Sequence, residues 1–341
     1  MTPLSPSVSS RLPSRSLGVR SVLSARMSGV PGSMLLMLGV GLTVVLGLSA
    51  RQAWSGLDPR SLWLDDLWVA VLVKRASLAE VVQLHAPVPY GFVLIEKLVR
   101  GLFGDGHLQL QAAPFLARLF AVAGLAWLTT ELTRHAGLGL LAGAGLAWQH
   151  ELAQQSVRVK HYTLDAALSV GLLALAIRFL RQPSRARLVA LGFLALVALP
   201  CSFPSAFVGP VVFSLCALWH AQQRRQLAPA DAWHALRWLV VFDGLGLVWL
   251  GWVVRQKATP ALQGFWSANY PATGSWRALW QFFRTGPGLT FLSGAFEPFG
   301  WLAWLVPIGV GVLLYRRWTR PLGVFVIVLY AAVLASGLLH L

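Results

Sequence analysis

The sequence predicts an all-α, polytopic membrane protein with about nine transmembrane helices. Of its 341 residues, 56% are hydrophobic and only 12% are charged, and the mean hydropathy is +0.64. Apolar stretches close to the length needed to cross a bilayer recur along the chain, and short arginine-rich segments separate many of them. This composition excludes a soluble globular domain.

The net charge of +16 is high enough to raise the question of a nucleic-acid partner. The basic residues, however, are scattered in short clusters and do not form one stripe with interleaved aromatics. We therefore expect no nucleic-acid partner and interpret the clusters as topology signals. The two cysteines, Cys201 and Cys216, lie in or beside apolar stretches and suit neither a disulfide framework nor a metal site.

Residues 1–32 contain four arginines, many serines and no acid, which predicts a disordered cytoplasmic tail rather than a transit peptide. Residues 33–341 are predicted to form a single transmembrane domain. Its first span, 33–50, is expected to be a retained signal anchor. The other spans are expected near 112–131, 137–150, 163–180, 188–203, 204–221, 238–254, 298–315 and 321–341.

The apolar stretch 88–103 is either a further span or a helix that lies on the membrane surface. Glu96, Lys97 and Arg100 fall on one helical face and apolar residues fall mostly on the other, a pattern typical of an interfacial helix. The arginine clusters decide between the two. Only the interfacial alternative places every short cluster on the cytoplasmic side.

With that choice, the loops 51–111 and 255–297 are external, the N-terminus is cytoplasmic, and the protein is a multi-pass protein of the inner membrane. The polar segment 154–165 lies on the external side, together with nine of the twelve acidic residues. We therefore expect the chemistry of this protein to face outward.

The polar segment 154–165 carries the densest group of candidate site residues. Arg158, Lys160 and His161 supply guanidinium, ammonium and imidazole donors within four positions, and Asp165 follows at the start of the next apolar stretch. Such donors suit the binding of a phosphate at the edge of a bilayer. The alternative is a solvated loop between two helices.

A second candidate is the carboxylate pair Asp65 and Asp66 in the first external loop, which apolar residues flank on both sides. Adjacent carboxylates repel, so one of them should have a raised pKa and is a candidate general base. The alternative is that an Asp caps a helix starting at Leu67. His85, at a proline-rich corner, is a candidate phosphate ligand. In the second long loop, Trp266 and Tyr270 suit either stacking on a substrate or an aromatic belt.

Taken in order, these motifs resemble the membrane-embedded glycosyltransferases of the GT-C superfamily, and among them the bacterial relatives of protein O-mannosyltransferases (glycosyltransferase family 39-like). The resemblance covers roughly residues 33–275. It is carried by Trp63-Leu64-Asp65-Asp66, His85-x-Pro87-x-x-Tyr90, Leu116-x-Arg118-Leu119, Ala153-Gln154-Gln155, Lys160-His161-Tyr162-x-Leu164-Asp165, Ser202-Phe203-Pro204-Ser205-Ala206-Phe207 and Phe265-Trp266-Ser267-Ala268-Asn269-Tyr270-Pro271.

The resemblance implies transfer of a sugar from a polyprenyl-phosphate donor in the membrane to an acceptor hydroxyl of a lipid, polysaccharide or protein. Asp65, Asp66 and Asp165 would be catalytic, with Asp65 as the general base of an inverting reaction. The expected donor-phosphate ligands are Arg158, Lys160, His161 and His85, and the expected substrate-binding residues are Tyr162, Tyr90, Trp266 and Tyr270. Whether Asp65 and Asp165 share a divalent cation stays open.

Two departures from the family pattern bear on these expectations. Asp66 stands where the family usually has Glu, and Ala86 interrupts the double proline that follows the family's histidine. Two alternative functions therefore remain: a transporter or flippase of a lipid-linked sugar, and a non-catalytic scaffold in envelope polysaccharide assembly. A transporter should show repeated halves and mid-membrane ionisable groups, whereas the acids of this chain gather at one surface. The sugar and the acceptor stay open.

Overall fold

The structure is a computed structural model, and it describes residues 32–56, 64–83, 88–224 and 229–257, with a few isolated positions beyond residue 274. Every regular element in these ranges is an α-helix, as the sequence predicts. The predicted tail and the predicted spans 298–315 and 321–341 lie outside the described ranges, so the count of nine spans stays a prediction.

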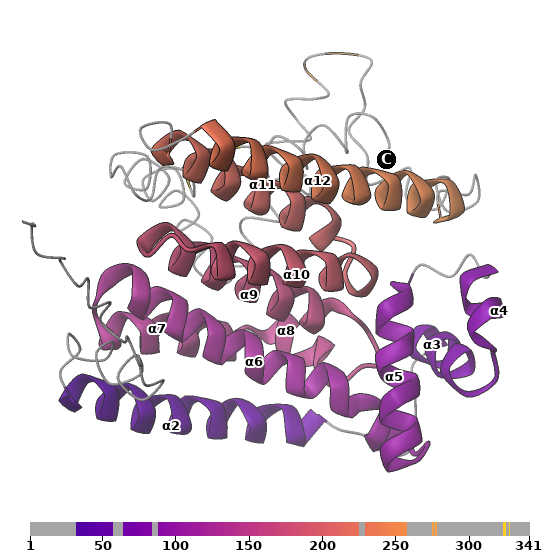
Figure 1. Cartoon of the computed structure of the whole chain (residues 1–341). Coiled ribbons are helices and arrows are strands. Elements are labelled where there is room, and N and C mark those ends of the chain that lie inside the picture. Colours follow the sequence, from indigo (N-terminus) through magenta and orange to yellow (C-terminus); the bar gives the residue numbers. More distant parts are fainter. Residues whose placement is uncertain are drawn as a thin grey trace, which may run out of the picture.

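Seven of the described helices run side by side and form the body of the molecule (Figure 1). Each of them coincides with a predicted span to within a few residues, except that the last begins nine residues before its predicted start. They are α2 (Gly32–Gly56), α6 (His107–Thr133), α7 (Ala136–Trp148), α9 (Tyr162–Arg181), α10 (Arg185–Cys201), α11 (Ser205–Arg224) and α12 (Pro229–Lys257).

Within the described ranges, three helices are long and apolar enough to cross a membrane: α2 over Leu36–Ser55, α6 and α9. Others are shorter in their apolar part. Helix α7, with 13 residues, is only about 20 Å long and cannot cross a hydrocarbon core of about 30 Å by itself. The described part of the chain therefore has the character of a membrane protein.

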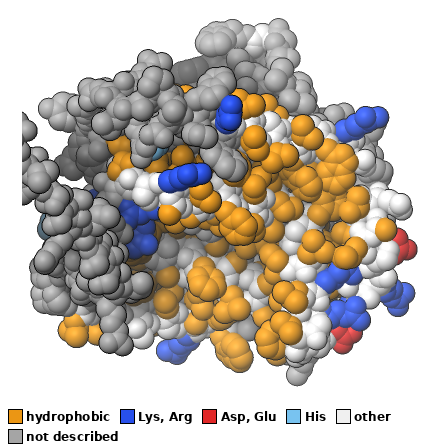
Figure 2. All heavy atoms as spheres, in the orientation of Figure 1, with side chains coloured by type: hydrophobic (Ala, Val, Ile, Leu, Met, Phe, Trp, Pro, Cys, Tyr) orange, Lys and Arg blue, Asp and Glu red, His pale blue; other side chains and the backbone are white. Residues whose placement is uncertain are grey.

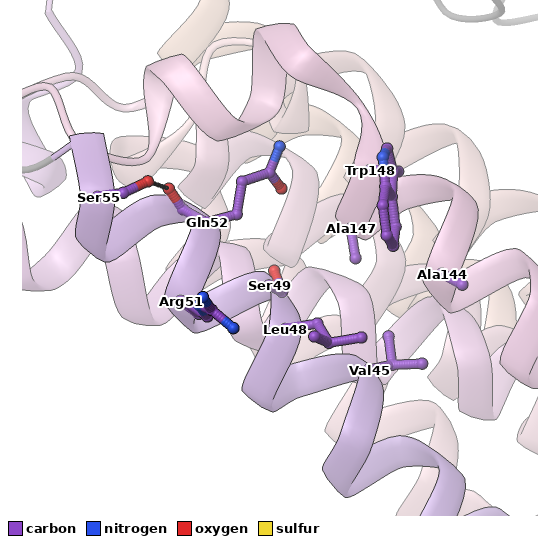
Figure 3. A pocket seen from close by; sticks show the side chains of 9 residues that line it. All are labelled: Val45, Leu48, Ser49, Arg51, Gln52, Ser55, Ala144, Ala147 and Trp148. Atoms are coloured by element: carbon purple, nitrogen blue, oxygen red, sulfur yellow. Dashed lines mark hydrogen bonds between the residues drawn. The ribbon is translucent and has the colours of Figure 1, made fainter.

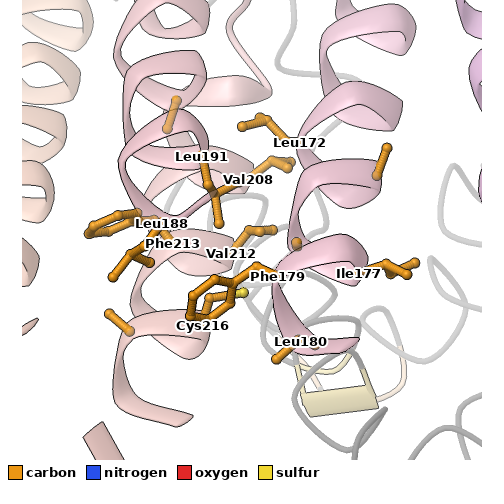
Figure 4. Packing of buried hydrophobic residues seen from close by; sticks show 14 of the residues in the cluster. Leu172, Ile177, Phe179, Leu180, Leu188, Leu191, Val208, Val212, Phe213 and Cys216 are labelled. Atoms are coloured by element: carbon orange, nitrogen blue, oxygen red, sulfur yellow. The ribbon is translucent and has the colours of Figure 1, made fainter. Parts of the chain in front are cut away.

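The main apolar core lies where α9, α10 and α11 meet (Figure 4). Leu172, Phe179 and Leu191 are completely buried there, and Phe213 from α11 is 1% exposed. Helices α6 and α9 are parallel neighbours: the Thr163 hydroxyl at the start of α9 donates a 2.8 Å hydrogen bond to the backbone carbonyl of Pro114, and Arg181 at the end of α9 pairs with Glu131 at the end of α6. This core holds the start of α9, and with it the polar segment, at a defined position.

One end of the bundle gathers arginine side chains from the connections α6–α7 and α9–α10. We call it the arginine-rich end, defined by Arg134, Arg178, Arg181, Arg185 and Arg187. Two of these side chains contact α6: Arg181 pairs with Glu131 at 2.8 Å, and the Arg178 guanidinium lies 4.7 Å from the centre of the Trp127 ring.

The opposite end carries the first predicted external loop. Three helices form there: α3 (Leu64–Lys74), α4 (Leu78–Gln83) and α5 (Tyr90–Phe103). Helix α5 runs across the end of the bundle, nearly perpendicular to the long helices (Figure 1), as an interfacial helix should. The acidic side chains visible in Figure 2 lie at this end, which we call the α5 end.

The orientation of α5 about its own axis is the reverse of what its amphipathic pattern first indicates. The polar face turns towards the protein: Lys97 Nζ donates to the carbonyls of Val73 and Ala76, and Arg100 Nη1 donates to those of Val73 and Lys74. These carbonyls lie at or just past the C-terminus of α3 and have no partner within the helix, which explains why cations are attracted there. The side chains of Leu94, Leu98 and Leu102 are exposed and form one stripe.

Glu96 lies within the polar face of α5 but is completely buried. In the part of the chain that the structure describes, neither of its carboxylate oxygens has a hydrogen-bond partner. Burial raises the pKa of Glu96 to about 8, so the carboxyl group is mostly protonated at neutral pH and carries no charge into the interior.

Close contact between α5 and the end of α10 yields the first prediction. A Cβ atom at Gly91 would lie 2.5 Å from Cys201 Sγ and 2.8 Å from the backbone carbon of Pro200, whereas one at Gly101 would meet nothing within 4 Å. Gly91→Ala should therefore lower the free energy of unfolding by about 1–3 kcal/mol. Gly101→Ala should raise it by about 0.5–1 kcal/mol through helix propensity. Thermal unfolding in detergent micelles measures both, and equal effects would contradict this packing.

The second prediction concerns orientation. If the arginine-rich end is cytoplasmic, a cysteine replacing Asp105 should react with a membrane-impermeant maleimide in intact cells, whereas one replacing the exposed Pro183 should react only after permeabilisation. The native Cys201 and Cys216 are buried and should give little background. Labelling of the Pro183 variant alone in intact cells would show that the orientation is opposite to the predicted one.

Candidate functional site

The polar segment forms a compact turn between two helices at the α5 end. Its central part, 156–161, follows the short helix α8 (His150–Gln155) and leads directly into α9, and its two ends belong to these helices. The backbone N–H of Lys160 donates a 2.8 Å hydrogen bond to the carbonyl of Arg158, and His161 is the N-terminal flanking residue of α9. The cationic side chains thus stand beside a helix N-terminus, whose partial positive charge adds to theirs.

An ion pair joins this segment to the first external loop. Arg158 Nε lies 3.6 Å from Asp66 Oδ2, and the Asp66 side chain is only 3% exposed. The Arg158 side chain is 26% exposed, so the contact lies at the edge of the buried interior. Two motifs far apart in the sequence are therefore brought together, as the hypothesis of one site requires.

His161 occupies an aromatic pocket and does not contribute a positive charge. Its ring lies 4.6 Å from that of Tyr162, 5.5 Å from that of Phe203 and 6.1 Å from that of Phe92, centre to centre. Burial, with a smaller contribution from the charge of Lys160, lowers the pKa of His161 to about 3. The ring is therefore neutral at neutral pH and can offer a hydrogen bond to a phosphate, but no charge.

Asp165 lies in the first turn of α9, next to His161. Its Oδ2 atom is 3.7 Å from His161 Nε2, and its carboxylate interacts with the hydroxyl of Ser202. Ser202 and Phe203 belong to the segment between α10 and α11 that resembles the glycosyltransferase pattern. The structure thus places a third motif against the polar segment.

The two predicted substrate-binding tyrosines have different surroundings. Tyr90 is buried, its hydroxyl donates to the Val82 carbonyl at 3.3 Å, and its ring packs on Trp249 and Trp252 of α12. These contacts give Tyr90 a role in holding α5 against α12. Tyr162 is 47% exposed beside His161, where a ligand can reach it.

The acidic pair of the first loop lies inside a helix. Because α3 begins at Leu64, Asp65 and Asp66 occupy its first turn and do not precede a helix starting at Leu67. The side chain of Asp65 lies outside the described part of the structure, as do His85, Trp266 and Tyr270. Their predicted roles stay predictions.

The sequence leaves open whether the protein binds a metal ion. Within the described ranges, no group of three or more His, Cys, Asp and Glu side chains is placed so that it could hold a metal ion. Asp165 is described and Asp65 is not, so a cation shared by the two stays an open hypothesis.

The structure adds one residue whose role sequence reasoning left unassigned. Arg118 is completely buried in α6 and binds three neutral partners: Nη2 donates to Gln52 Oε1 at 2.9 Å and to the Ala147 carbonyl at 2.5 Å, and Nη1 lies 3.4 Å from Ser156 Oγ. It thus connects α2, the end of α7 and the start of the polar turn. In the sequence, the sign of such a role is an arginine inside an apolar stretch.

Comparison with known proteins does not add to this picture, because no protein-family model and no curated protein matches the chain. The resemblance to GT-C glycosyltransferases therefore rests on the ordered motifs alone.

The contact between Asp66 and Arg158 predicts a measurable coupling. Asp66→Asn and Arg158→Gln should each destabilise the fold by about 1–3 kcal/mol, because each removes one charge of an ion pair in which the Asp66 side chain is only 3% exposed. The double variant should lose at least about 1 kcal/mol less than the sum of the two. Thermal unfolding of the four proteins in detergent micelles tests this.

The matched control is the pair Lys74 and Asp105 at the same end, separated by 4.0 Å with exposed fractions of 33% and 60%. Its coupling should be below about 1 kcal/mol. Additive effects of the Asp66 and Arg158 substitutions would show that this ion pair does not hold the site together.

Proposed function

We propose that the chain is a membrane glycosyltransferase that moves a sugar from a polyprenyl-phosphate donor to an acceptor hydroxyl. The observation that supports this most directly is the contact between Asp66 and Arg158. It joins the acidic motif and the cationic segment at one end of a helical bundle, although the two lie far apart in the sequence. An acid and a phosphate-binding group within reach of one substrate is the minimum that this reaction requires.

In the proposed reaction, the acceptor oxygen attacks the anomeric carbon and the bond from that carbon to the phosphate oxygen breaks. Asp65 takes the acceptor proton, and the electron pair of the broken bond leaves with the polyprenyl phosphate. Attack opposite the leaving group inverts the anomeric configuration. No oxidant or reductant is involved. The acceptor gives one proton to Asp65 and receives the sugar in its place.

The residues of the polar turn provide for the charge that grows on the leaving phosphate. Lys160 supplies a cation beside the N-terminus of α9, and Arg158 supplies a second one that Asp66 orients. Each such donor is worth a few kcal/mol in a site that excludes water, or about 10²–10³ in rate. The neutral ring of His161 would contribute a hydrogen bond, and its neighbour Asp165 would keep the ring oriented.

The helices of the first loop suit a substrate that arrives from the bilayer. Trp68 of α3 and Leu98 and Leu102 of α5 are all more than 60% exposed, so the apolar faces of both helices are available to lipid. A prenyl chain lying along this surface would bring its phosphate to the level of the polar turn. With the arginine-rich end cytoplasmic, this site faces the outer side of the inner membrane.

A transporter of a lipid-linked sugar is the principal rival, and covalent transfer distinguishes the two. Mass spectrometry of cell-envelope glycans, with and without the protein, should show a hexose or pentose that only the producing strain adds. Asp65→Asn should lower turnover by at least about 10², because the amide cannot take the acceptor proton while its shape is kept. Lys160→Ala should be inactive, and Lys160→Arg should keep part of the activity because the charge remains.

Asp105→Asn serves as the matched control, since it removes an exposed carboxylate at the same end and should leave turnover unchanged. Full restoration of the glycan by Asp65→Asn would show that Asp65 is not the base. An identical glycan profile with and without the protein would overturn the transferase proposal itself.

A further inference from the structure

A cavity of about 490 Å³ lies between α2 and α7 (Figure 3). It exists because side chains of different size follow one another along this interface. At Gly41 the two helices are in close contact, since a Cβ atom there would lie 2.4 Å from Leu140 Cδ1. One turn further along α7, Ala144 and Ala147 face Val45 and Ser49 and leave the space between the helices unfilled.

The lining of this cavity changes from apolar to polar along α2. Val45 and Leu48 line its deeper part, and Arg51, Gln52 and Ser55 line the part nearest the α5 end. None of the described residues that line the cavity is acidic. A ligand that matches this lining has an apolar portion towards the middle of the bundle and an anionic portion at its end.

Two buried groups mark the cavity as a binding site and not only a packing fault. Ser49 lines it, is 1% exposed, and its hydroxyl has no hydrogen-bond partner among the described residues. Behind the polar part, the buried guanidinium of Arg118 binds Gln52 and the carbonyl of Ala147, which both line the cavity. An anion beside Arg51 would therefore also lie in the field of a second cation in surroundings of low dielectric constant.

The cavity borders the face of α2 that meets the bilayer. Val40, Val44 and Leu48 are between 48% and 60% exposed along this face, so the apolar part of a ligand can enter from the side. A water-soluble anion would leave the apolar part unfilled, which favours an occupant drawn from the membrane.

We propose that this groove binds one anionic phospholipid. Its phosphodiester contacts Arg51 and the polar side chains of Gln52 and Ser55, and the glycerol region reaches the hydroxyl of Ser49. One acyl chain lies along Val45 and Leu48.

Binding at this place also bears on the polar turn. Gln52 accepts a hydrogen bond from Arg118, which in turn contacts Ser156 at the start of the turn. A lipid that holds the end of α2 therefore holds one support of Arg118. This inference does not depend on the proposed transfer reaction.

The test is native mass spectrometry of the full chain, purified in a mild detergent and titrated with phosphatidylglycerol or phosphatidylcholine. One phosphatidylglycerol molecule should bind at saturation at low lipid concentration, and phosphatidylcholine should bind at least about fivefold more weakly. Arg51→Ala should weaken phosphatidylglycerol binding by at least about fivefold. Ala144→Phe, which fills the groove and keeps every charge, should also weaken it.

Arg75→Ala is the matched control, because Arg75 is an exposed arginine at the same end that does not line the groove. It should bind phosphatidylglycerol like the parent. Equal affinity of Arg51→Ala and the parent, or equal binding of the two lipids, would overturn the proposal. One-for-one displacement of phosphatidylglycerol by a polyprenyl phosphate would overturn it too, since the groove would then belong to the carrier. None of these outcomes depends on sugar transfer, so they are distinguishable from a failure of the proposed function.

Discussion

The need of charged groups to find polar partners within an apolar bundle is the constraint on which the structure depends. Water is scarce between the helices, and an unpartnered charge there is costly. Arg118 shows the solution most clearly: three neutral oxygens from other described elements, and no described carboxylate, contact its terminal guanidinium nitrogens. The same need places Lys97 and Arg100 on the terminal carbonyls of α3 and Arg181 on Glu131.

This constraint separates the two ends of the molecule. At the arginine-rich end, Arg134, Arg178 and Arg181 lie at the C-termini of α6 and α9, where they complement the helix dipoles. Arg185 and Arg187 lie instead in the first turn of α10, and their presence at this end matches the usual cytoplasmic bias. At the α5 end, acids and cations occur together and pair across elements, as Asp66 does with Arg158. Chemistry that needs both an acid and a cation is therefore confined to one end.

The first external loop shows how the same rule shapes the surface. The cations on the polar face of α5 bind the carbonyls of α3, so this face turns inward and the leucines of the opposite face are exposed. A helix that would expose charges to water if it stood alone instead offers an apolar stripe to lipid. The site proposed for sugar transfer and the groove proposed for a phospholipid thus lie at the same end of a body whose described residues are largely apolar on the face seen in Figure 2.

The sequence by itself determined the helical class, the positions of the described long helices and the helix near residues 88–103, because hydrophobic length and period are local properties. It also identified Arg158, Lys160 and Asp165 as a group, since they are neighbours in the chain. The pairing of Asp66 with Arg158, the neutral ring of His161 and the inward turn of Lys97 were decided only by tertiary structure. Each depends on which side chains other helices bring close and on how much water they exclude, and a single sequence records neither.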